Sequence, residues 1–303
     1  MQPSMNFLIK EEKVYPGALS CRGCGWALLV RHLASILGEN TVYVVPASCF
    51  SIIAGPYPLN ELKGSIVHTV FAAAPATATG IRAALDRQGK KDVTVAVLAG
   101  DGGTFDIGLQ SLSGAASRGE NILYVANNNG AYMNTGIQTS TATPYGAVTT
   151  TNPQDNYKKT WPKDLMGIIT AHNIPYAATC SLAYIEDFRR KIKKAKDTKG
   201  FRFLMVDGPC PPGHKTEPAQ SITISRLAVE TKLFPLFEAE HQNFTINFKP
   251  EKDLPVDECL KYQGRFKHLF KDESRKALKE IQKYVDYNWK RLLELEARSF
   301  DLN

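Results

Sequence analysis

Two polar motifs that could bind a metal-bridged phosphate follow apolar runs in the middle of the chain. Gly100-Asp101-Gly102 comes directly after the run 93–99, and Asn127-Asn128-Asn129 follows the run 122–126. An aspartate at the phosphate-binding edge of a sheet would repel an anion unless a divalent cation lay between them. Carboxylate and amide oxygens are ligands that Mg²⁺ accepts together with diphosphate oxygens. We therefore expect Asp101 to be a magnesium ligand.

The separation of the motifs suits a single site. Asn129 lies 28 residues after Asp101, and a strand, a crossover helix and the next strand need about 30 residues. Both loops should then reach one sheet edge. This GDG to NN spacing is typical of enzymes that bind thiamine diphosphate through Mg²⁺, and it predicts these cofactor-binding residues: Gly100, Asp101, Gly102, Gly103 and Asn129. A GDG alone is a common turn, so a plain structural turn is the alternative.

The cysteines are a second candidate metal site. Four of the six lie in motifs or after predicted strands: Cys21, Cys24, Cys49 and Cys210. A CxxC pair with two distant thiolates can hold a 4Fe-4S cluster or a tetrahedral zinc ion, and the ligands alone do not separate these. Buried inert thiols are the other alternative. Cys180 and Cys259 have no partner spacing, and we interpret them as packing residues.

Composition narrows the class of protein. The 303 residues are 43% hydrophobic and 22% charged, which predicts a globular protein with a full core. We find neither the apolar run of about 7 to 15 residues of a signal peptide nor the roughly 18 apolar residues of a membrane span. We therefore expect a cytoplasmic protein without a membrane partner. Thiols stay reduced there, so six cysteines favour metal binding or catalysis over disulfides.

The formal net charge of +7 would suit an acidic partner, an anionic ligand or nucleic acid, and by itself selects none of them. The basic residues of the run 189–196 lie opposite Ile185, Phe188 and Ile192 in a helical period, which predicts a solvated helix face. Nucleic-acid binding would require exposed aromatic residues among the basic ones. Because these are missing, we expect no nucleic-acid partner.

Strand and helix patterns alternate along the first two thirds of the chain. Four nearly continuous apolar runs predict buried parallel strands: Thr41 to Val45, Val93 to Ala99, Ile122 to Ala126 and Phe203 to Val206. Four stretches of helical period lie among them: Trp26 to Leu37, Thr77 to Arg87, Ile107 to Arg118 and Ala183 to Lys196. The alternation predicts an α/β fold in which helices flank a parallel sheet.

The pattern changes after Cys210. We divide the chain into an α/β domain over 1–214, which would bind the cofactor and the cluster, and a second part over 215–303. Residues 215–255 are predicted to be irregular, and Asp272 to Glu296 to be a helical arm. The apolar stripe of this helix consists of Leu278, Ile281, Val285, Trp289 and Leu292. The arm would pack on the same domain or on a partner subunit.

Five segments together resemble one protein family, the β subunits of 2-oxoacid:ferredoxin oxidoreductases, most closely the pyruvate type. The segments are CRGCG, GDGGTFDIGLQSLSGA, AYMNTGIQTSTATPYGA, PCPPG and QGRFKHLF. They occur in the family's order and span most of the chain. The resemblance implies a thiamine-diphosphate-binding α/β fold in which the matching cysteines hold a 4Fe-4S cluster near the cofactor. It therefore favours iron-sulfur over zinc.

The resemblance also implies roles for single residues. Asp101 and Asn129 would be magnesium ligands, with the carbonyl of Ala131 as a third. Asn134 of YMNTG would lie close to the thiazolium carbon that attacks the substrate, and it is a candidate catalytic residue. Gly25 of CRGCG is a candidate cofactor-binding residue. The pyrimidine-activating glutamate and further clusters would come from partner chains, the α/γ and δ-type subunits, with ferredoxin as the electron acceptor.

Three positions depart from the pyruvate-type patterns CxGCGE and DNEAYMNTG. Trp26 replaces a glutamate, Asn128 an aspartate and Gly130 a second glutamate. Trp26 is accordingly our second candidate catalytic residue. A like charge about 4 Å from an anion costs on the order of several kcal/mol at reduced dielectric, so fewer acidic groups favour a substrate with more negative charge than pyruvate. We hypothesise oxalate, which would yield only carbon dioxide and electrons; neutral drift with compensation elsewhere is the alternative.

Pyruvate is the other candidate substrate. It would be converted to acetyl-CoA, and only in that case would coenzyme A be a cofactor. Two further classes stay open: a non-catalytic module that binds zinc, and a thiamine-dependent decarboxylase without redox chemistry.

Overall fold

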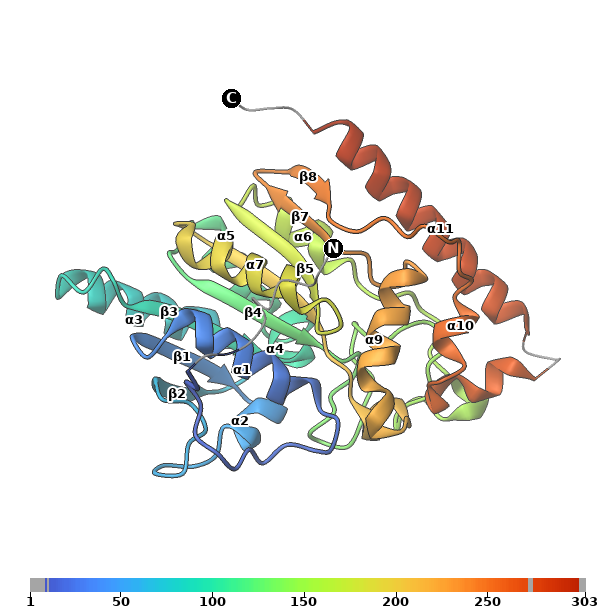
Figure 1. Cartoon of the computed structure of the whole chain (residues 1–303), viewed down its shortest axis with the longest axis horizontal. Coiled ribbons are helices and arrows are strands. Elements are labelled where there is room, and N and C mark those ends of the chain that lie inside the picture. Colours follow the sequence, from blue (N-terminus) through green and yellow to red (C-terminus); the bar gives the residue numbers. More distant parts are fainter. Residues whose placement is uncertain (1–8, 10, 272–274, 300–303) are drawn as a thin grey trace.

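The computed structural model describes residues 9, 11–271 and 275–299. Within these residues, one eight-stranded sheet runs through the molecule and helices cover both of its faces (Figure 1). The strands follow the order β2, β1, β3, β4, β6, β5, β7, β8 across the sheet. Their bounds are β1 (Thr41–Pro46), β2 (Ser65–Thr69), β3 (Thr94–Ala99), β4 (Leu123–Asn128), β5 (Tyr176–Ser181), β6 (Arg202–Asp207), β7 (Phe237–Glu240) and β8 (Asn243–Ile246).

The sheet is mixed. Strands β1 to β6 are parallel, which confirms the predicted parallel α/β arrangement for most of the sheet. β7 pairs antiparallel with β5, and β8 pairs antiparallel with β7. These two strands, together with helix α9 (Ser221–Glu230), lie in residues 215–255. The prediction that this segment is irregular was wrong, because strands of four residues are too short to show a period of two.

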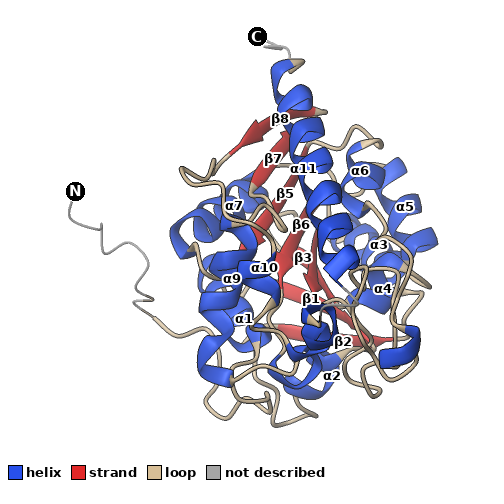
Figure 2. Cartoon of the chain, turned by 90° about the vertical axis from the view of Figure 1, so that its right-hand side faces the viewer, coloured by secondary structure: helices blue, strands red, loops and turns tan. Residues whose placement is uncertain are grey.

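Two helical layers explain why the central strands are apolar along their whole length (Figure 2). In β3, Val95 and Val97 face one layer, and Ala96 and Leu98 face the other. The first layer consists of α3 (Ala74–Arg87), α5 (Leu109–Ser117) and α6 (Leu165–Thr170), and the second of α1 (Gly25–Leu37), α2 (Cys49–Ile53) and α7 (Ile185–Asp197). Both faces of a parallel sheet are buried in this way, so its strands cannot alternate with polar residues.

A short helix, α4 (Asp101–Phe105), precedes α5 and was not predicted. Gly108 lies in the turn between them. A Cβ atom at this position would be 2.0 Å from the carbonyl oxygen of Gly103, so the chain can only turn here with glycine. The predicted helix Ile107–Arg118 therefore begins at Leu109 and ends at Ser117.

Short helices lie in the connections of the second half of the chain, which ends in a long helix. They are α8 (Pro211–His214), α10 (Asp257–Leu260) and the 3₁₀ helices η2 (Gln154–Asn156), η3 (Pro218–Gln220) and η4 (Gly264–Phe270). Helix α11 (Arg275–Ala297) buries Ile281, Val285 and Leu292 of the predicted stripe. The first residues of the predicted helix, 272–274, lie outside the described part of the chain. The division at residue 214 stays a prediction.

The end of α11 lies against β8. The carboxylate of Glu296 accepts the backbone N–H of Ile246 at 2.8 Å, and the hydroxyl of Ser299 accepts that of Phe244 at 2.6 Å. β8 is the last strand of the sheet, so these bonds satisfy donors that no further strand pairs. In the described part of the chain, no helix has both the length and the apolar sequence needed to cross a membrane.

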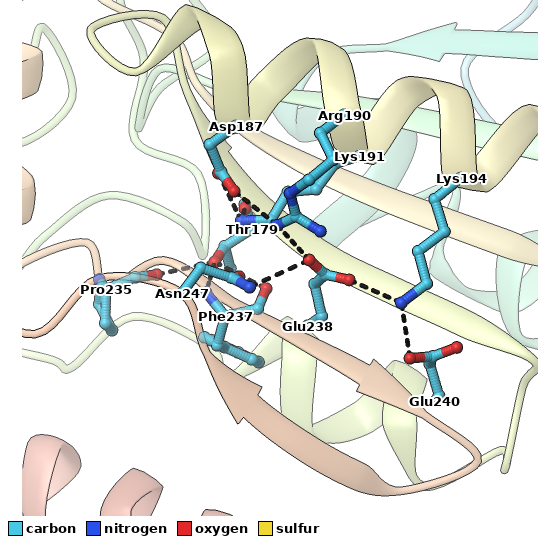
Figure 3. Close-up of polar contacts among 10 residues, drawn as sticks. All are labelled: Thr179, Asp187, Arg190, Lys191, Lys194, Pro235, Phe237, Glu238, Glu240 and Asn247. Carbon is cyan, nitrogen blue, oxygen red and sulfur yellow. Dashed lines mark hydrogen bonds and ion pairs between the residues drawn. The ribbon is translucent and has the colours of Figure 1, made fainter. Parts of the chain in front are cut away.

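Basic side chains of α7 form ion pairs with carboxylates (Figure 3). Lys191 is fully buried, donates to the carbonyl of Thr179 at 2.8 Å and pairs with Asp187 at 2.6 Å. Arg190 and Lys194 both pair with the buried carboxylate of Glu238 on β7. The prediction of a solvated face was wrong for Lys191, which packs against β5, whereas Arg190 and Lys194 keep 49% and 34% of their side-chain surface exposed.

Candidate functional site

Asp101 and Asn129 meet at the carboxyl edge of the sheet, as their spacing predicts. Asp101 begins α4 directly after β3, and Asn129 follows β4, which pairs with β3. The carboxylate of Asp101 accepts the backbone N–H of Asn129 at 3.3 Å through Oδ1. Its Oδ2 accepts the hydroxyl of Ser140 at 2.7 Å. The two predicted magnesium ligands are therefore adjacent.

Three oxygens converge at this point. The side-chain oxygen of Asn129 lies 3.2 Å from Oδ1 of Asp101 and 2.9 Å from the carbonyl oxygen of Ala131, and none of these three atoms is a donor. Magnesium binds oxygen at about 2.0–2.1 Å in an octahedron, so neighbouring ligands stand about 2.9 Å apart. The observed separations fit one face of such a shell. If the Asn129 amide is instead rotated, its nitrogen would donate to both oxygens.

Burial disfavours a free negative charge on the Asp101 carboxylate, and a bound metal ion would compensate for this cost. The Asp101 side chain is 3% exposed. Burial raises the pKa of Asp101 from 3.8 to about 7, although the hydrogen bonds from Ser140 and Asn129 work in the opposite direction. A divalent cation would favour the charged form of this carboxyl group. The donor set therefore fits Mg²⁺ in charge as well as in spacing.

Gly102 of the GDG turn and the following Gly103 are closely packed. A Cβ at Gly102 would lie 2.8 Å from the ring of Tyr132, and one at Gly103 would lie 3.0 Å from Pro46. Gly100 precedes α4 in an extended conformation, with a φ of −93°. These residues allow the turn to lie close to the neighbouring loops, and direct cofactor contacts for them stay a prediction.

The two candidate catalytic residues occupy different environments. Asn134 is exposed in a tight turn that a bridge between Tyr132 and Gln138 closes. It can therefore approach a ligand at the sheet edge. Trp26 is 1% exposed and stacks on Phe50 with ring centroids 4.9 Å apart. This position favours core packing by Trp26, since its helical period turns the side chain inward.

The four motif cysteines gather on the same side of the sheet. The backbone N–H of Gly25, which follows Cys24, donates to the carbonyl of Pro209, which precedes Cys210, at 3.0 Å. Burial, together with the neighbouring thiols of Cys210, Cys24 and Cys21, raises the pKa of the Cys49 thiol to about 12. Iron would offset this cost, because it stabilises thiolates.

Gly25 allows the CxxC loop and the Cys210 loop to pack closely. A Cβ at this position would lie 2.7 Å from the ring of Pro209, so only glycine lets the CxxC loop lie against the Cys210 loop. Among the residues that the structure describes, no group of three or more His, Cys, Asp or Glu side chains converges on one metal ion. Cys180 and Cys259, the predicted packing residues, are both 0% exposed.

Two cavities flank the convergent oxygens. A cavity of about 580 Å³ extends from Asn129 and Gly130 to α11, and His214 and Arg265 also line it. A second cavity of about 460 Å³ is lined by Asp106, Tyr132, Ser140 and Lys158 among others. Sequence reasoning missed Ser140, His214 and Arg265. The only signal was the family resemblance, because AYMNTGIQTSTATPYGA contains Ser140, QGRFKHLF contains Arg265 and PCPPG adjoins His214.

Comparison with known proteins agrees with this geometry. The family described as "Thiamine pyrophosphate enzyme, C-terminal TPP binding domain" matches residues 47–206. The ketoisovalerate oxidoreductase subunit VorB of Pyrococcus furiosus is 45% identical over 295 residues, which cover 94% of each chain. The pyruvate synthase subunit PorB of Methanothermobacter thermautotrophicus is 45% identical over 280 residues, covering 91% of this chain and 96% of that protein.

A solved structure shares the fold. The 2-oxoglutarate:ferredoxin oxidoreductase from Magnetococcus marinus, with 2-oxoglutarate, coenzyme A and succinyl-CoA bound, matches with a TM-score of 0.59 at 22% identity. The match covers 74% of this chain and 82% of that chain.

The relatives also correct the expectations about function. They favour pyruvate or ketoisovalerate over oxalate, so the substrate hypothesis built on the missing acidic residues is not supported, and the pyruvate alternative is better supported. The same relatives are subunits of redox enzymes. They therefore do not support the alternatives of a non-catalytic zinc module or of a decarboxylase without redox chemistry. Relatives at 45% identity cover nearly the whole chain, and the chain therefore belongs to the β subunits of 2-oxoacid:ferredoxin oxidoreductases, enzymes that act through several subunits.

Proposed function

We propose that this chain holds magnesium, thiamine diphosphate and one 4Fe-4S cluster, and that the assembled enzyme oxidises pyruvate or ketoisovalerate with coenzyme A as acyl acceptor and ferredoxin as electron acceptor. The observation that carries the proposal is the convergence of the Asp101 carboxylate, the Asn129 side-chain amide and the Ala131 carbonyl at one edge of the sheet. The cysteine loops on the same side of the sheet support the redox part.

Each residue contributes binding or orientation. Asp101, Asn129 and Ala131 would hold the metal that bridges to the diphosphate, and Ser140 fixes the Asp101 carboxylate through its hydrogen bond. Asn134, exposed in the adjoining turn, would approach the reacting carbon. When bound, thiamine diphosphate supplies the nucleophilic carbon and accepts the electron pair left by decarboxylation. Partner subunits of the α/γ and δ type would supply the pyrimidine-activating glutamate and cover the site.

The cysteines supply an electron acceptor within the same chain. Cys21, Cys24, Cys49 and Cys210 would each bind one iron of a 4Fe-4S cluster. The cluster would lie beside the cofactor because Cys210 begins the segment whose last residue, His214, contacts Asn129. Electrons could then leave one at a time toward clusters in the partner chains and toward ferredoxin.

The lining of the larger cavity supports a 2-oxoacid with an apolar side chain. Phe105, Ala142 and Pro144 line this cavity together with Asn129 and Gly130, and the cations Lys163 and Arg265 line it as well. These apolar groups suit the methyl group of pyruvate or the isopropyl group of ketoisovalerate.

The test is an anaerobic substrate panel on the enzyme assembled from this chain and its partner subunits. Ferredoxin reduction would be measured with pyruvate, ketoisovalerate, 2-oxoglutarate and oxalate, each with and without coenzyme A and thiamine diphosphate. We expect reduction with pyruvate or ketoisovalerate that requires both cofactors. Activity with oxalate alone, independent of coenzyme A, would overturn the substrate assignment and leave the enzyme class intact.

A separate measurement tests the cluster. The chain purified without oxygen should be brown, with broad absorbance near 400 nm and about four irons per chain. A colourless chain without iron, in an enzyme that still reduces ferredoxin, would remove the cluster from this subunit.

A further inference from the structure

One backbone carbonyl in the candidate metal site receives two side-chain donors. The carbonyl oxygen of Asn129 accepts Nε2 of His214 at 2.7 Å and a guanidinium nitrogen of Arg265 at 3.4 Å. A carbonyl only accepts, so Nε2 carries the proton and the His214 ring is held in one tautomer. The peptide between Asn129 and Gly130 is therefore fixed from outside the loop that contains it.

This peptide belongs to the turn that carries the proposed magnesium ligands. The amide oxygen of Asn129 and the carbonyl of Ala131 flank it on either side. Gly130 has a φ of +74°, and a Cβ there would lie 3.1 Å from Arg265. The turn can adopt this conformation at little cost only with glycine, and glycine alone does not hold it rigid. Within the turn, the N–H groups of Asn129 and Gly130 donate to Asp101 and Asn128, and the two donors on the carbonyl hold the peptide from its other side.

His214 joins this turn to the cysteines. It is the last residue of α8, and its backbone N–H donates to the carbonyl of Cys210 at 2.8 Å. A single helical turn therefore separates a proposed cluster ligand from the side chain that holds Asn129. Cys210 also lies at the loop on which the CxxC motif packs through Gly25 and Pro209.

Arg265 reaches the same carbonyl from the C-terminal part of the chain. The backbone N–H of Gly264 donates to the carbonyl of Lys215 at 3.1 Å, so the start of η4 lies beside the end of α8. Nε of Arg265 donates to Gln263 at 3.0 Å, which aims the guanidinium group at the turn. Both side chains are buried, at 6% and 7% exposure, and water does not replace them easily.

We propose that His214 and Arg265 are positioning residues that hold the metal-binding turn through the Asn129 carbonyl, and that His214 links this turn to the cluster loop. The inference rests on the proposed function. Two consequences follow. Loss of the donors should weaken binding of magnesium and thiamine diphosphate, and binding of the cofactor should in turn stabilise the cysteine loop, because coupling between two sites is reciprocal.

The first measurement is the dissociation constant of magnesium thiamine diphosphate, determined by calorimetry on the enzyme purified with its partner subunits. A buried carbonyl that loses its donor should weaken binding about tenfold in His214→Leu. The amide of His214→Gln can still donate, and this variant should stay within about threefold of the wild type. Arg265→Met should weaken binding and Arg265→Lys should largely restore it. His172→Leu is the control, since the ring of His172 bonds Ser113 and Ser117 on α5, and not the metal-binding turn.

The second measurement tests the link. Iron release to a chelator is followed in the wild type and in His214→Leu, with and without magnesium thiamine diphosphate. We expect the cofactor to slow release in the wild type and in His172→Leu, and to have no effect in His214→Leu. A general loss of stability would speed release with and without cofactor and would leave the cofactor effect in place.

The outcomes separate the two proposals. If the wild type binds no magnesium thiamine diphosphate, the proposed function fails and this inference fails with it. If the wild type binds it and all His214 and Arg265 variants bind equally well, only the positioning role is overturned. If His214→Leu binds weakly but retains cofactor protection of iron, the link to the cluster loop is wrong.

Discussion

The carboxylate of Glu238 allows the contribution of the α7–β7 contact to be measured directly (Figure 3). Glu238 is 3% exposed, accepts Lys194 at 2.9 Å and Asn247 at 3.0 Å, and also pairs with Arg190. Glu238→Gln removes the charge and keeps the shape. We expect this change to destabilise the isolated chain, because two cations lose their shared partner.

The expected loss of stability in Glu238→Gln follows from how deeply each partner of the ion pair is buried. Removing one partner of a buried ion pair costs about 3–5 kcal/mol, and a hydrogen bond to a charged group contributes about 1.5–3 kcal/mol. Arg190 and Lys194 keep 49% and 34% of their side-chain surface exposed, so both can turn to water after the change. We therefore expect the lower end, about 3 kcal/mol, or a decrease in Tm of about 6 °C.

The pH dependence gives a second check. Burial alone would raise the pKa of Glu238, but the hydrogen bonds from Arg190 and Lys194 outweigh it and lower the pKa below 4.5. The folded-state pKa is thus below the unfolded one, and the stabilisation is present above about pH 4.5 and lost as the pH falls through the folded-state value. The Tm difference between the wild type and Glu238→Gln should shrink accordingly in acid.

Glu240→Gln is the matched control. Glu240 is on the same strand and bonds Lys194 at 2.6 Å, but its side chain is 52% exposed. Exposed pairs contribute about 0.2–1 kcal/mol, so this variant should melt within about 2 °C of the wild type. Equal effects of the two substitutions in thermal denaturation at pH 8 would refute the argument from burial.

Three further predictions concern the candidate site. Asp101→Asn should weaken magnesium-dependent binding of thiamine diphosphate by about a hundredfold, because even mutation of residues that only support metal ligands lowers metal affinity about 10- to 100-fold. Unchanged binding in calorimetry would exclude Asp101 as a ligand. Gly130→Ala should cost about 1–2 kcal/mol in thermal denaturation, because its φ is +74° and its Cβ would approach Arg265. Cys49→Ala should abolish the iron of the anaerobically purified chain, whereas Cys180→Ala should retain it; iron analysis that shows equal content would remove Cys49 from the cluster.

The metal-binding turn could be predicted from sequence because its geometry follows from chain length. Asp101 and Asn129 end neighbouring parallel strands, and a strand-helix-strand unit brings their loops to one edge. Ser140 bonds Asp101 but comes from a loop 39 residues farther along, where no regular element fixes the path. His214 and Arg265 likewise meet Asn129 through tertiary packing alone.

A departure from the family pattern, which made Trp26 a candidate, does not show which way a side chain points. Trp26 adjoins the CxxC motif, yet it lies in α1 and turns into the core against Phe50. The basic run of α7 suggested contact with water, yet Lys191 is buried against β5. The parallel strands β1, β3, β4 and β6 were recognised because burial on both faces leaves long apolar runs. The parallel strands β2 and β5, which carry polar residues within them, and the antiparallel hairpin were not recognised.

Helix α11 does more than complete the core, because its end closes the sheet. β8 is the terminal strand, and an unpaired strand edge is a template for other chains. Glu296 and Ser299 occupy the outward N–H groups of Ile246 and Phe244, so a neighbouring molecule finds no free donors at those two positions. Removal of the residues from Glu296 onward would therefore expose this strand edge. We expect the shortened chain to aggregate by strand addition, even if the cofactor site is left intact.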